Sequence, residues 1–217
     1  MELILWFVDL VLHLDKHLLE LLQQFGPWLY VILFAIIFAE TGLVVTPILP
    51  GDSLLFAVGA LAAVDTTGTL NAPLISVLLA IAAVLGNTVN YQIGRAIGPR
   101  AFSGRVRFMK VEYLRRTESF FEKYGPMTIV LSRFVPIVRT FAPFVAGIGH
   151  MAYLRFQSYN ILGGVSWVML FIWGGYLFGN IPIIKNNFGI VTILIIVVSV
   201  MPAVLALMKR KREPATG

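Results

Sequence analysis

The sequence predicts an all-α integral membrane protein with two re-entrant helical hairpins, three transmembrane helices and amphipathic interfacial helices. Of its 217 residues, 58% are apolar and 13% are charged, whereas soluble domains hold about 45–50% apolar and about 25% charged residues. Three uncharged apolar stretches, 72–94, 156–184 and 186–208, are each long enough to cross a bilayer, which takes about 20 residues. The length suits a single membrane domain over 1–217.

The first residues predict an amphipathic helix rather than a signal peptide. Residues 1–24 place apolar side chains at helical spacing, with charged side chains broadly opposite, which is typical of a helix lying in the interface. The acids Glu2 and Asp9 stand where a signal peptide would carry positive charge. The chain has no cysteine, so a disulfide, a thiolate nucleophile and a cysteine metal site are excluded. We expect no metal and no cofactor.

Two further apolar stretches, 28–64 and 126–149, contain charges and helix breakers and do not resemble plain lipid-facing helices. Non-helical backbone at membrane depth persists only where protein or a water-filled cavity covers it. We therefore interpret both stretches as re-entrant hairpins. Their expected breaks lie at Pro47, Pro50 and Gly51 in the first, and at Pro136 and Pro143 in the second.

Positive charge predicts the orientation of the chain. The segment 99–123 and the tail 209–217 are both basic, and basic residues next to apolar spans mark the cytoplasmic side. The spans 156–184 and 186–208 cross out and back. A re-entrant 126–149 that returns to its own side then leaves both basic segments, and the C-terminus, in the cytoplasm.

A faint internal repeat relates 25–98 to 124–184. Gly26-Pro27 opens the first hairpin and Gly125-Pro126 opens the second, with Glu40 and Arg139 each fourteen residues after the glycine. The spans that follow end in paired glycines, Gly94 with Gly98 and Gly175 with Gly179, a spacing that permits close helix packing. Paired broken helices in two halves indicate a transporter's site, and the charge argument favours inverted halves.

Four charges lie within the interrupted stretches: Glu40, Asp52, Arg133 and Arg139. Each costs at least about 2.5–3.5 kcal/mol at a helix centre. Structural ion pairs are the alternative, but buried pairs stabilise poorly compared with apolar packing. A turn near Pro47 would bring the two acids to similar depth, and a break at Pro136 would turn the two arginines toward one cavity. We expect all four to converge between the hairpins.

This set of charges suits anion transport linked to protons. Arginine offers a planar, permanently charged fork that matches phosphate oxygens. Burial and a nearby arginine act in opposite directions on a carboxylate, and their balance can leave it able to exchange protons near neutral pH. Arg133 and Arg139 are therefore the expected headgroup-binding residues, and Glu40 and Asp52 the expected proton-coupling residues.

Other polar residues in the spans carry weaker signals. Asn87, Asn90 and Tyr91 are secondary candidates, expected to cap backbone or bridge helices more often than to touch substrate. Asn160 is expected to anchor its span at the membrane interface, and Trp167 to serve in packing.

Each broken stretch contains a distinctive motif. The segment 40–55 contains Glu40-Thr41-Gly42 and Pro50-Gly51-Asp52, and the segment 132–147 contains Ser132-Arg133-Phe134 and Arg139-Thr140. These two motifs resemble the first and second signatures of the DedA family, also called the VTT or SNARE-associated domain. The segment between them, 86–95, also resembles the family, although Asn87 stands where some members carry an acid.

The resemblance implies a multi-pass protein of the bacterial inner membrane that moves lipids in a manner linked to the proton-motive force. Undecaprenyl phosphate and phospholipids are the lipids it implies, and its required acids and arginines match Glu40, Asp52, Arg133 and Arg139. The alternatives are a small-cation/proton antiporter and a membrane assembly factor without transport. An enzyme is not expected, since no cysteine or intramembrane histidine offers a nucleophile or general base. The expected partners are membrane lipids, protons and a second copy of the chain, but not nucleic acid.

Overall fold

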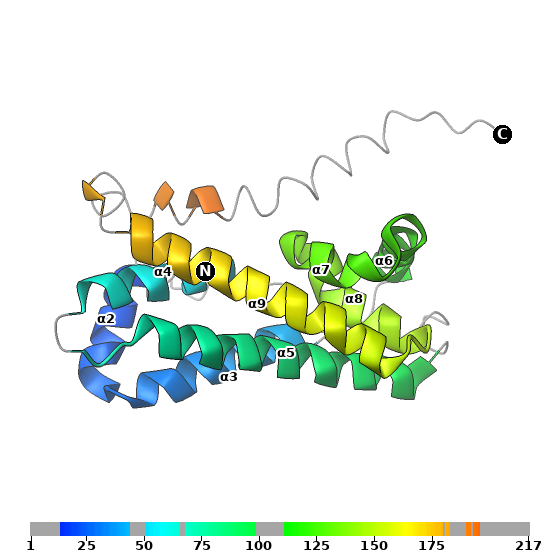
Figure 1. Cartoon of the computed structure of the whole chain (residues 1–217), viewed down its shortest axis with the longest axis horizontal. Coiled ribbons are helices and arrows are strands. Elements are labelled where there is room, and N and C mark those ends of the chain that lie inside the picture. Colours follow the sequence, from blue (N-terminus) through cyan, green and yellow to red (C-terminus); the bar gives the residue numbers. More distant parts are fainter. Residues whose placement is uncertain are drawn as a thin grey trace, which may run out of the picture.

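The computed structural model describes residues 14–43, 51–65, 68–98, 111–179, 181–182, 190–191 and 193–195. These residues form helices and connecting turns, without a strand among them (Figure 1). The elements in chain order are α2 (Leu14–Phe25), α3 (Trp28–Gly42), α4 (Gly51–Val64), α5 (Ala72–Ile97), α6 (Val111–Tyr124), η2 (Gly125–Met127), α7 (Thr128–Leu131), η3 (Ser132–Phe134), α8 (Pro136–Ile148) and α9 (Tyr153–Phe178). Most of the expected span 186–208, of which only 190–191 and 193–195 are described, lies outside the described residues, as do the expected hairpin breaks at Pro47 and Pro50.

The two longest helices, α5 and α9, are long and apolar enough to cross a membrane. The side chain of Asn71 caps the first turn of α5 by accepting a hydrogen bond from the Leu74 amide at 2.9 Å. At the C-terminal end of α9, the amide of Gly179 donates a hydrogen bond to the Gly175 carbonyl and ends the helix. The α9 helix therefore ends at Phe178 rather than at residue 184, because a glycine and Pro182 follow.

Both interrupted stretches form short helices rather than one continuous helix. The first gives α3 and α4. The second gives η2, α7 and η3, then an extended residue at Val135, then α8 beginning at Pro136. The predicted break at Pro136 is therefore confirmed. The predicted break at Pro143 is wrong, because α8 runs through it. The neighbouring α5 also bonds to α8 here, since Asn90 Nδ2 donates to the Thr140 carbonyl at 2.9 Å.

The second helix of each interrupted stretch packs against the long helix from the other half of the chain, whereas α3 packs on α5 and α7 on α9, each within its own half. The α4 helix lies along α9, while α8 lies along α5, and α5 and α9 also pack on each other (Figure 1). Glycines make both seams close and reciprocal. A Cβ at Gly59 would lie 1.9 Å from the Ile172 carbonyl oxygen, and one at Gly175 would lie 1.9 Å from the Phe56 oxygen.

The seam between α5 and α8 is built in the same way. A Cβ at Gly94 would lie 2.1 Å from the Phe144 carbonyl oxygen, and a Cβ at Gly147 would lie 2.1 Å from the Tyr91 carbonyl oxygen. Helices packed in a membrane gain from such close approach, because lipid tails give little hydrophobic drive for helix association. Each seam therefore depends on bare backbone at two positions.

Replacing Gly175 by alanine should loosen the α4–α9 seam and lower the melting temperature of the purified protein in detergent. The added methyl group meets backbone rather than a movable side chain, and such overpacking costs about 1–3 kcal/mol. The matched control is Gly174→Ala on the same helix, where the nearest atom to the new Cβ is the Phe56 ring edge at 4.0 Å. Equal melting temperatures for the two variants would contradict the close packing of α4 on α9 at Gly175.

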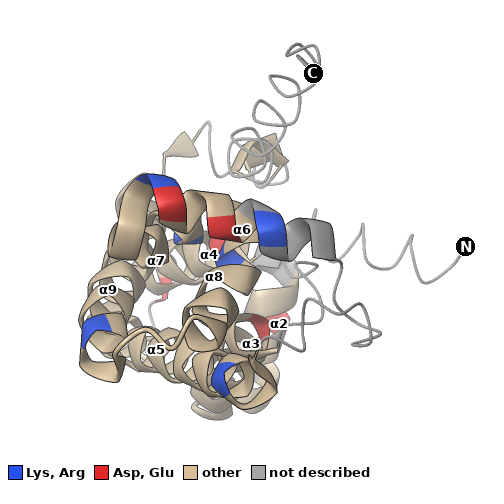
Figure 2. Ribbon diagram, turned by 90° about the vertical axis from the view of Figure 1, so that its right-hand side faces the viewer, with Lys and Arg blue, Asp and Glu red and all other residues tan. Residues whose placement is uncertain are grey.

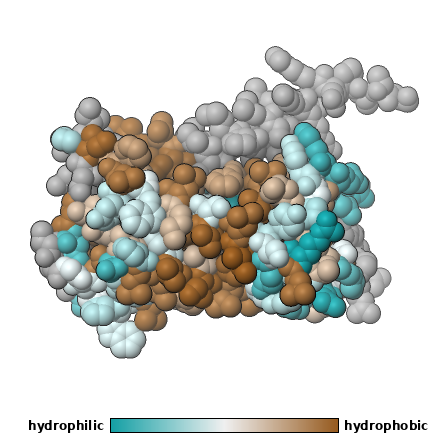
Figure 3. Space-filling view, in the orientation of Figure 1, coloured by the Kyte–Doolittle hydropathy of each residue, from teal (hydrophilic) through white to brown (hydrophobic). Residues whose placement is uncertain are grey.

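The outer surface of the long helices is apolar. Successive turns of α5 expose Leu74, Val77, Ile81 and Leu85, each between 45% and 56% accessible. A brown hydrophobic band covers much of the face in Figure 3, and the teal polar side chains gather at its right-hand end, where α6 lies in Figure 1. A contiguous exposed apolar surface of this kind is typical of lipid contact.

The basic segment 99–123 predicts an amphipathic helix. The α6 helix, which contains the described part of that segment, is amphipathic. Thr117 is buried on its inner side, whereas Arg115, Glu118, Glu122 and Lys123 are exposed. Figure 2 shows both charge signs along α6. The α2 helix likewise buries Leu18 and Leu22 while Glu20 is exposed. How these helices lie relative to a membrane stays a prediction.

The matching fourteen-residue spacings place Glu40 and Arg139 at different ends of their helices. Glu40 lies in the last turn of α3, whereas Arg139 lies in the first turn of α8. The internal repeat stays a prediction. The inverted orientation of the halves stays a prediction.

Candidate functional site

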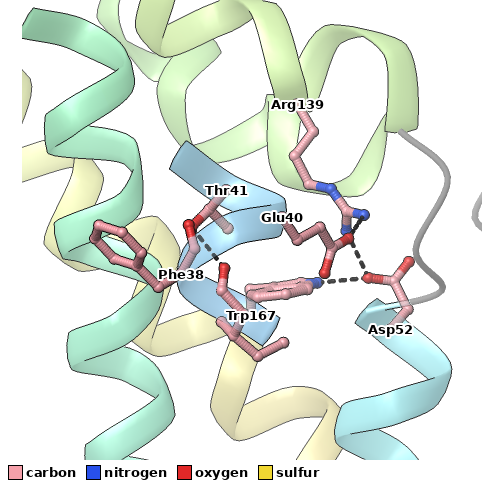
Figure 4. Close-up of polar contacts among 7 residues, drawn as sticks. Phe38, Glu40, Thr41, Asp52, Arg139 and Trp167 are labelled. Atoms are coloured by element: carbon pink, nitrogen blue, oxygen red, sulfur yellow. Dashed lines mark hydrogen bonds and ion pairs between the residues drawn. The ribbon is translucent and has the colours of Figure 1, made fainter. Parts of the chain in front are cut away.

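Three of the four predicted charges meet at one point between the two interrupted stretches (Figure 4). Arg139 Nη1 donates to Asp52 Oδ1 at 2.7 Å, and its Nη2 donates to Glu40 Oε1 at 2.5 Å. The three side chains come from α8, α4 and α3, and all three residues are less than 10% exposed. One guanidinium therefore bridges two carboxylates that a membrane would otherwise penalise. We call Glu40, Asp52 and Arg139 the charged triad.

Trp167 of α9 completes the triad. Its indole Nε1 donates to Asp52 Oδ1 at 2.8 Å, and the residue is fully buried (Figure 4). The guanidinium carbons of Arg139 and Arg133 lie 5.2 Å and 5.8 Å from its ring centroid, within cation–π range. Trp167 packs in the buried core, as expected, and it also links an acid to both arginines.

Arg133 lies beside the same indole but outside the triad. Its Nη2 donates to Asn160 Oδ1 at 2.9 Å, and the residue is 1% exposed. Asn160 is fully buried, so the expectation that it anchors α9 at the interface is wrong. The four charges thus form one buried region with two parts, the charged triad and Arg133, and they do not meet in a single four-way contact.

Both missed residues share one face of α9 with two glycines. Asn160, Gly163, Gly164 and Trp167 follow the i, i+3, i+4, i+7 spacing of a single helix face. A polar amide followed at this spacing by two residues without side chains is a signal for a bulky buried group opposite. That signal was available in the sequence and could have predicted that Arg133 lies against this face of α9.

The secondary candidates on α5 hold the helices around the site. Asn90 Nδ2 donates to the Thr140 carbonyl and, at 3.2 Å, to the Thr41 carbonyl. Thr41 lies in the last turn of α3, where carbonyls lack helical partners. Tyr91 donates its hydroxyl to the Met151 carbonyl, and Asn87 Nδ2 donates to Asn160 Oδ1 at 3.0 Å. Asn87 therefore acts on the site through Asn160.

The backbone at Gly51 brings α4 close to the first acid. A Cβ at this position would lie 2.0 Å from Glu40 Oε2, so a side chain there would displace the carboxylate. Gly51 begins α4, next to Asp52. A predicted hairpin break thus serves to bring the two acids together on neighbouring arms, as the charge spacing requires.

The family described as the VTT domain matches residues 49–177, which include three of the four buried charges. Protein DedA of Escherichia coli (strain K12) is 51% identical over 216 residues, covering 99% of this chain and 98% of that protein. The chain belongs to the DedA family. An uncharacterized membrane protein of Mycobacterium leprae (strain TN) is 43% identical over 172 residues, covering 79% of this chain and 76% of the relative.

Membership of the DedA family makes this chain a membrane protein, in agreement with its two long apolar helices. Inner membrane protein YqjA of Escherichia coli (strain K12) is 37% identical over 156 residues, 71% of this chain and 70% of that protein. These names give neither a transported substrate nor an enzyme activity. No solved structure gives a significant match. The chemistry of the site has to be argued from its own residues.

Proposed function

We propose that this DedA-family protein translocates a phosphate-bearing lipid across the inner membrane in a proton-linked manner. Undecaprenyl phosphate and phospholipids are the proposed substrates. The observation that carries the proposal is the buried region in which two arginines and two acids lie around Trp167. Intramembrane charges of this kind mark substrate and proton pathways, and buried ion pairs stabilise a fold poorly compared with apolar packing.

The charge balance of the site supports the link to protons. With both acids ionised, Glu40, Asp52, Arg133 and Arg139 sum to zero. An anionic headgroup that enters this buried region adds negative charge, which is costly away from water. A proton taken up by Glu40 or Asp52 restores neutrality and weakens that acid's hold on Arg139. Anion entry and proton entry therefore favour each other, as reciprocal coupling between two ligands requires.

The proposal is tested by headgroup translocation in sealed proteoliposomes. Undecaprenyl phosphate and phosphatidylethanolamine are compared with and without a pH gradient. We expect the gradient to accelerate the movement of one of them, and Glu40→Gln to remove that acceleration because the variant has one proton-accepting carboxylate fewer. The matched control is Glu122→Gln, which changes an exposed acid of α6 and should leave translocation unchanged.

Two other results would count against the proposal. Gradient-driven flux of a small cation without lipid movement would favour a cation/proton antiporter. The site argues against that reading, because both acids already bind Arg139 and a cation would have to displace it. Absence of both lipid and ion movement would favour an assembly role.

A further inference from the structure

The two buried arginines differ in how their donors are used. Both terminal nitrogens of Arg139 bind carboxylates. Arg133 instead binds only uncharged oxygens of Asn160, the side-chain Oδ1 at 2.9 Å and the backbone carbonyl at 3.5 Å. Its Nε and Nη1 have no hydrogen-bond partner within the part of the chain that the structure describes. Arg133 therefore keeps a full positive charge and donors to spare.

The α9 helix leaves room for this guanidinium at Gly163 and Gly164, and we call this place the seat of Arg133. A Cβ at Gly163 would lie 3.2 Å from Arg133 Nε, and a Cβ at Gly164 would lie 3.1 Å from Nη2. Two consecutive glycines thus let the guanidinium rest against the helix backbone, with the Trp167 ring beside it. The seat fixes the position of the cation without supplying an anion.

Asn160 is held so that its oxygen faces Arg133. Its Nδ2 donates to the Val84 carbonyl at 3.0 Å and to Gln157 Oε1 at 2.9 Å. Its Oδ1 is left to accept from Arg133 and from Asn87. A carboxylate at this position would neutralise the arginine, whereas the amide orients it and leaves its charge free. The arrangement suits a cation that is kept ready for an incoming anion.

A buried cation without an anionic partner is costly, and a group that supplies the missing charge and acceptors is bound strongly. Phosphate oxygens fit the planar donors of arginine. Resting on the proposed function above, we propose that Arg133 receives the phosphate oxyanion of the transported lipid, while Arg139 remains with Glu40 and Asp52. Asn160 is the positioning residue that holds Arg133 in its seat.

The test uses the full chain purified in detergent and measures binding by calorimetry. The probes are inorganic phosphate, a short-chain phosphatidic acid, and a short-chain diacylglycerol as the phosphate-free comparison. Binding of both phosphate probes means that the oxyanion is enough. Binding of phosphatidic acid alone means that the lipid tails are needed as well. Binding of diacylglycerol as tightly as phosphatidic acid would overturn the proposal.

Asn160→Asp is the decisive variant, because it pairs Arg133 with a carboxylate of nearly the same shape. We expect it to weaken binding of the phosphate probe by about 10- to 100-fold, the value of hydrogen bonds to a charged group. The matched control is Ser158→Asp, which adds the same charge at an exposed position of α9 and should leave affinity within a few-fold. Melting temperatures show whether each variant is folded.

A second variant keeps the proposal testable should Asn160→Asp fail to fold. Glu40→Gln, Asp52→Asn and Arg139→Gln together replace the charged triad by neutral amides. This variant should no longer transport but should still bind phosphate, and adding Arg133→Gln should abolish that binding. Phosphate binding that persists without Arg133 would overturn this inference but would not contradict the proposed function. Phosphate binding at Arg133 without lipid movement would overturn the proposed function instead.

Discussion

Arg139→Gln is expected to abolish translocation and to destabilise the protein more than any other single change at the site. It leaves Glu40 and Asp52 buried side by side without their shared cation. Removing one partner from a buried ion pair costs about 3–5 kcal/mol, and here two carboxylates lose the same partner. For a chain of this size the loss corresponds to a melting temperature lower by roughly 10 °C, measurable from helical circular dichroism in detergent.

Neutralising the acids should reverse most of that loss in stability. Adding Glu40→Gln and Asp52→Asn to Arg139→Gln removes the uncompensated charge, so the melting temperature should recover while translocation stays absent. The matched control is Arg155→Gln, which changes an exposed arginine on α9 and should alter neither property. A single Arg139→Gln variant that melts like the unaltered protein would show that the triad is not buried as described.

The second large effect is expected at Trp167. Trp167→Ala should lower the free energy of unfolding by about 3–5 kcal/mol, because it empties a fully buried site. Trp167→Phe keeps most of the ring but removes the N–H that Asp52 accepts. It should cost about 1.5–3 kcal/mol, the value of a hydrogen bond to a charged group. Both are read as shifts in the melting temperature.

Trp173 provides the comparison, since it lies two turns further along α9, is half-buried and packs beside Tyr176. Trp173→Ala should cost clearly less than Trp167→Ala. Similar losses from the two alanine variants would mean that Trp167 acts only through its volume. A Trp167→Phe variant as stable as the unaltered protein would show that the hydrogen bond from Trp167 to Asp52 does not stabilise the fold.

The sequence predicts the charged residues of this site better than it predicts the uncharged residues that contact them. Glu40, Asp52 and Arg139 could be found because charge within an apolar stretch is costly and therefore conspicuous. Their convergence followed from helix breakers that lie between them. Asn160 and Trp167 carry no net charge and occur often near span ends, so their roles depended on which neighbours face them, which only tertiary packing determines.

The helices show the same division. The long helices α5 and α9 were predictable from uninterrupted apolar character. The α5 helix begins at residue 72 as predicted but runs to Ile97 instead of residue 94, and α9 covers Tyr153–Phe178 instead of 156–184. Pro136 ends one helix because it follows an extended residue, whereas Pro143 is accommodated within α8. A proline in the first turn removes no helical hydrogen bond, whereas a proline in the helix interior removes one, so the two prolines differ by their position in α8.

The interleaving of the two hairpins sets an order of events during biosynthesis. Asp52 precedes Arg139, to which it is bonded, by 87 residues in the chain. Glu40 precedes Arg139 by 99 residues. At synthesis rates of about 5–20 residues per second, Asp52 waits between about 4 and 17 s for that cation, and Glu40 between about 5 and 20 s. Throughout this interval α4 also lacks α9, the helix on which it rests. The first half therefore enters the membrane carrying two unpaired acids, which have to stay hydrated or protonated until the second half arrives.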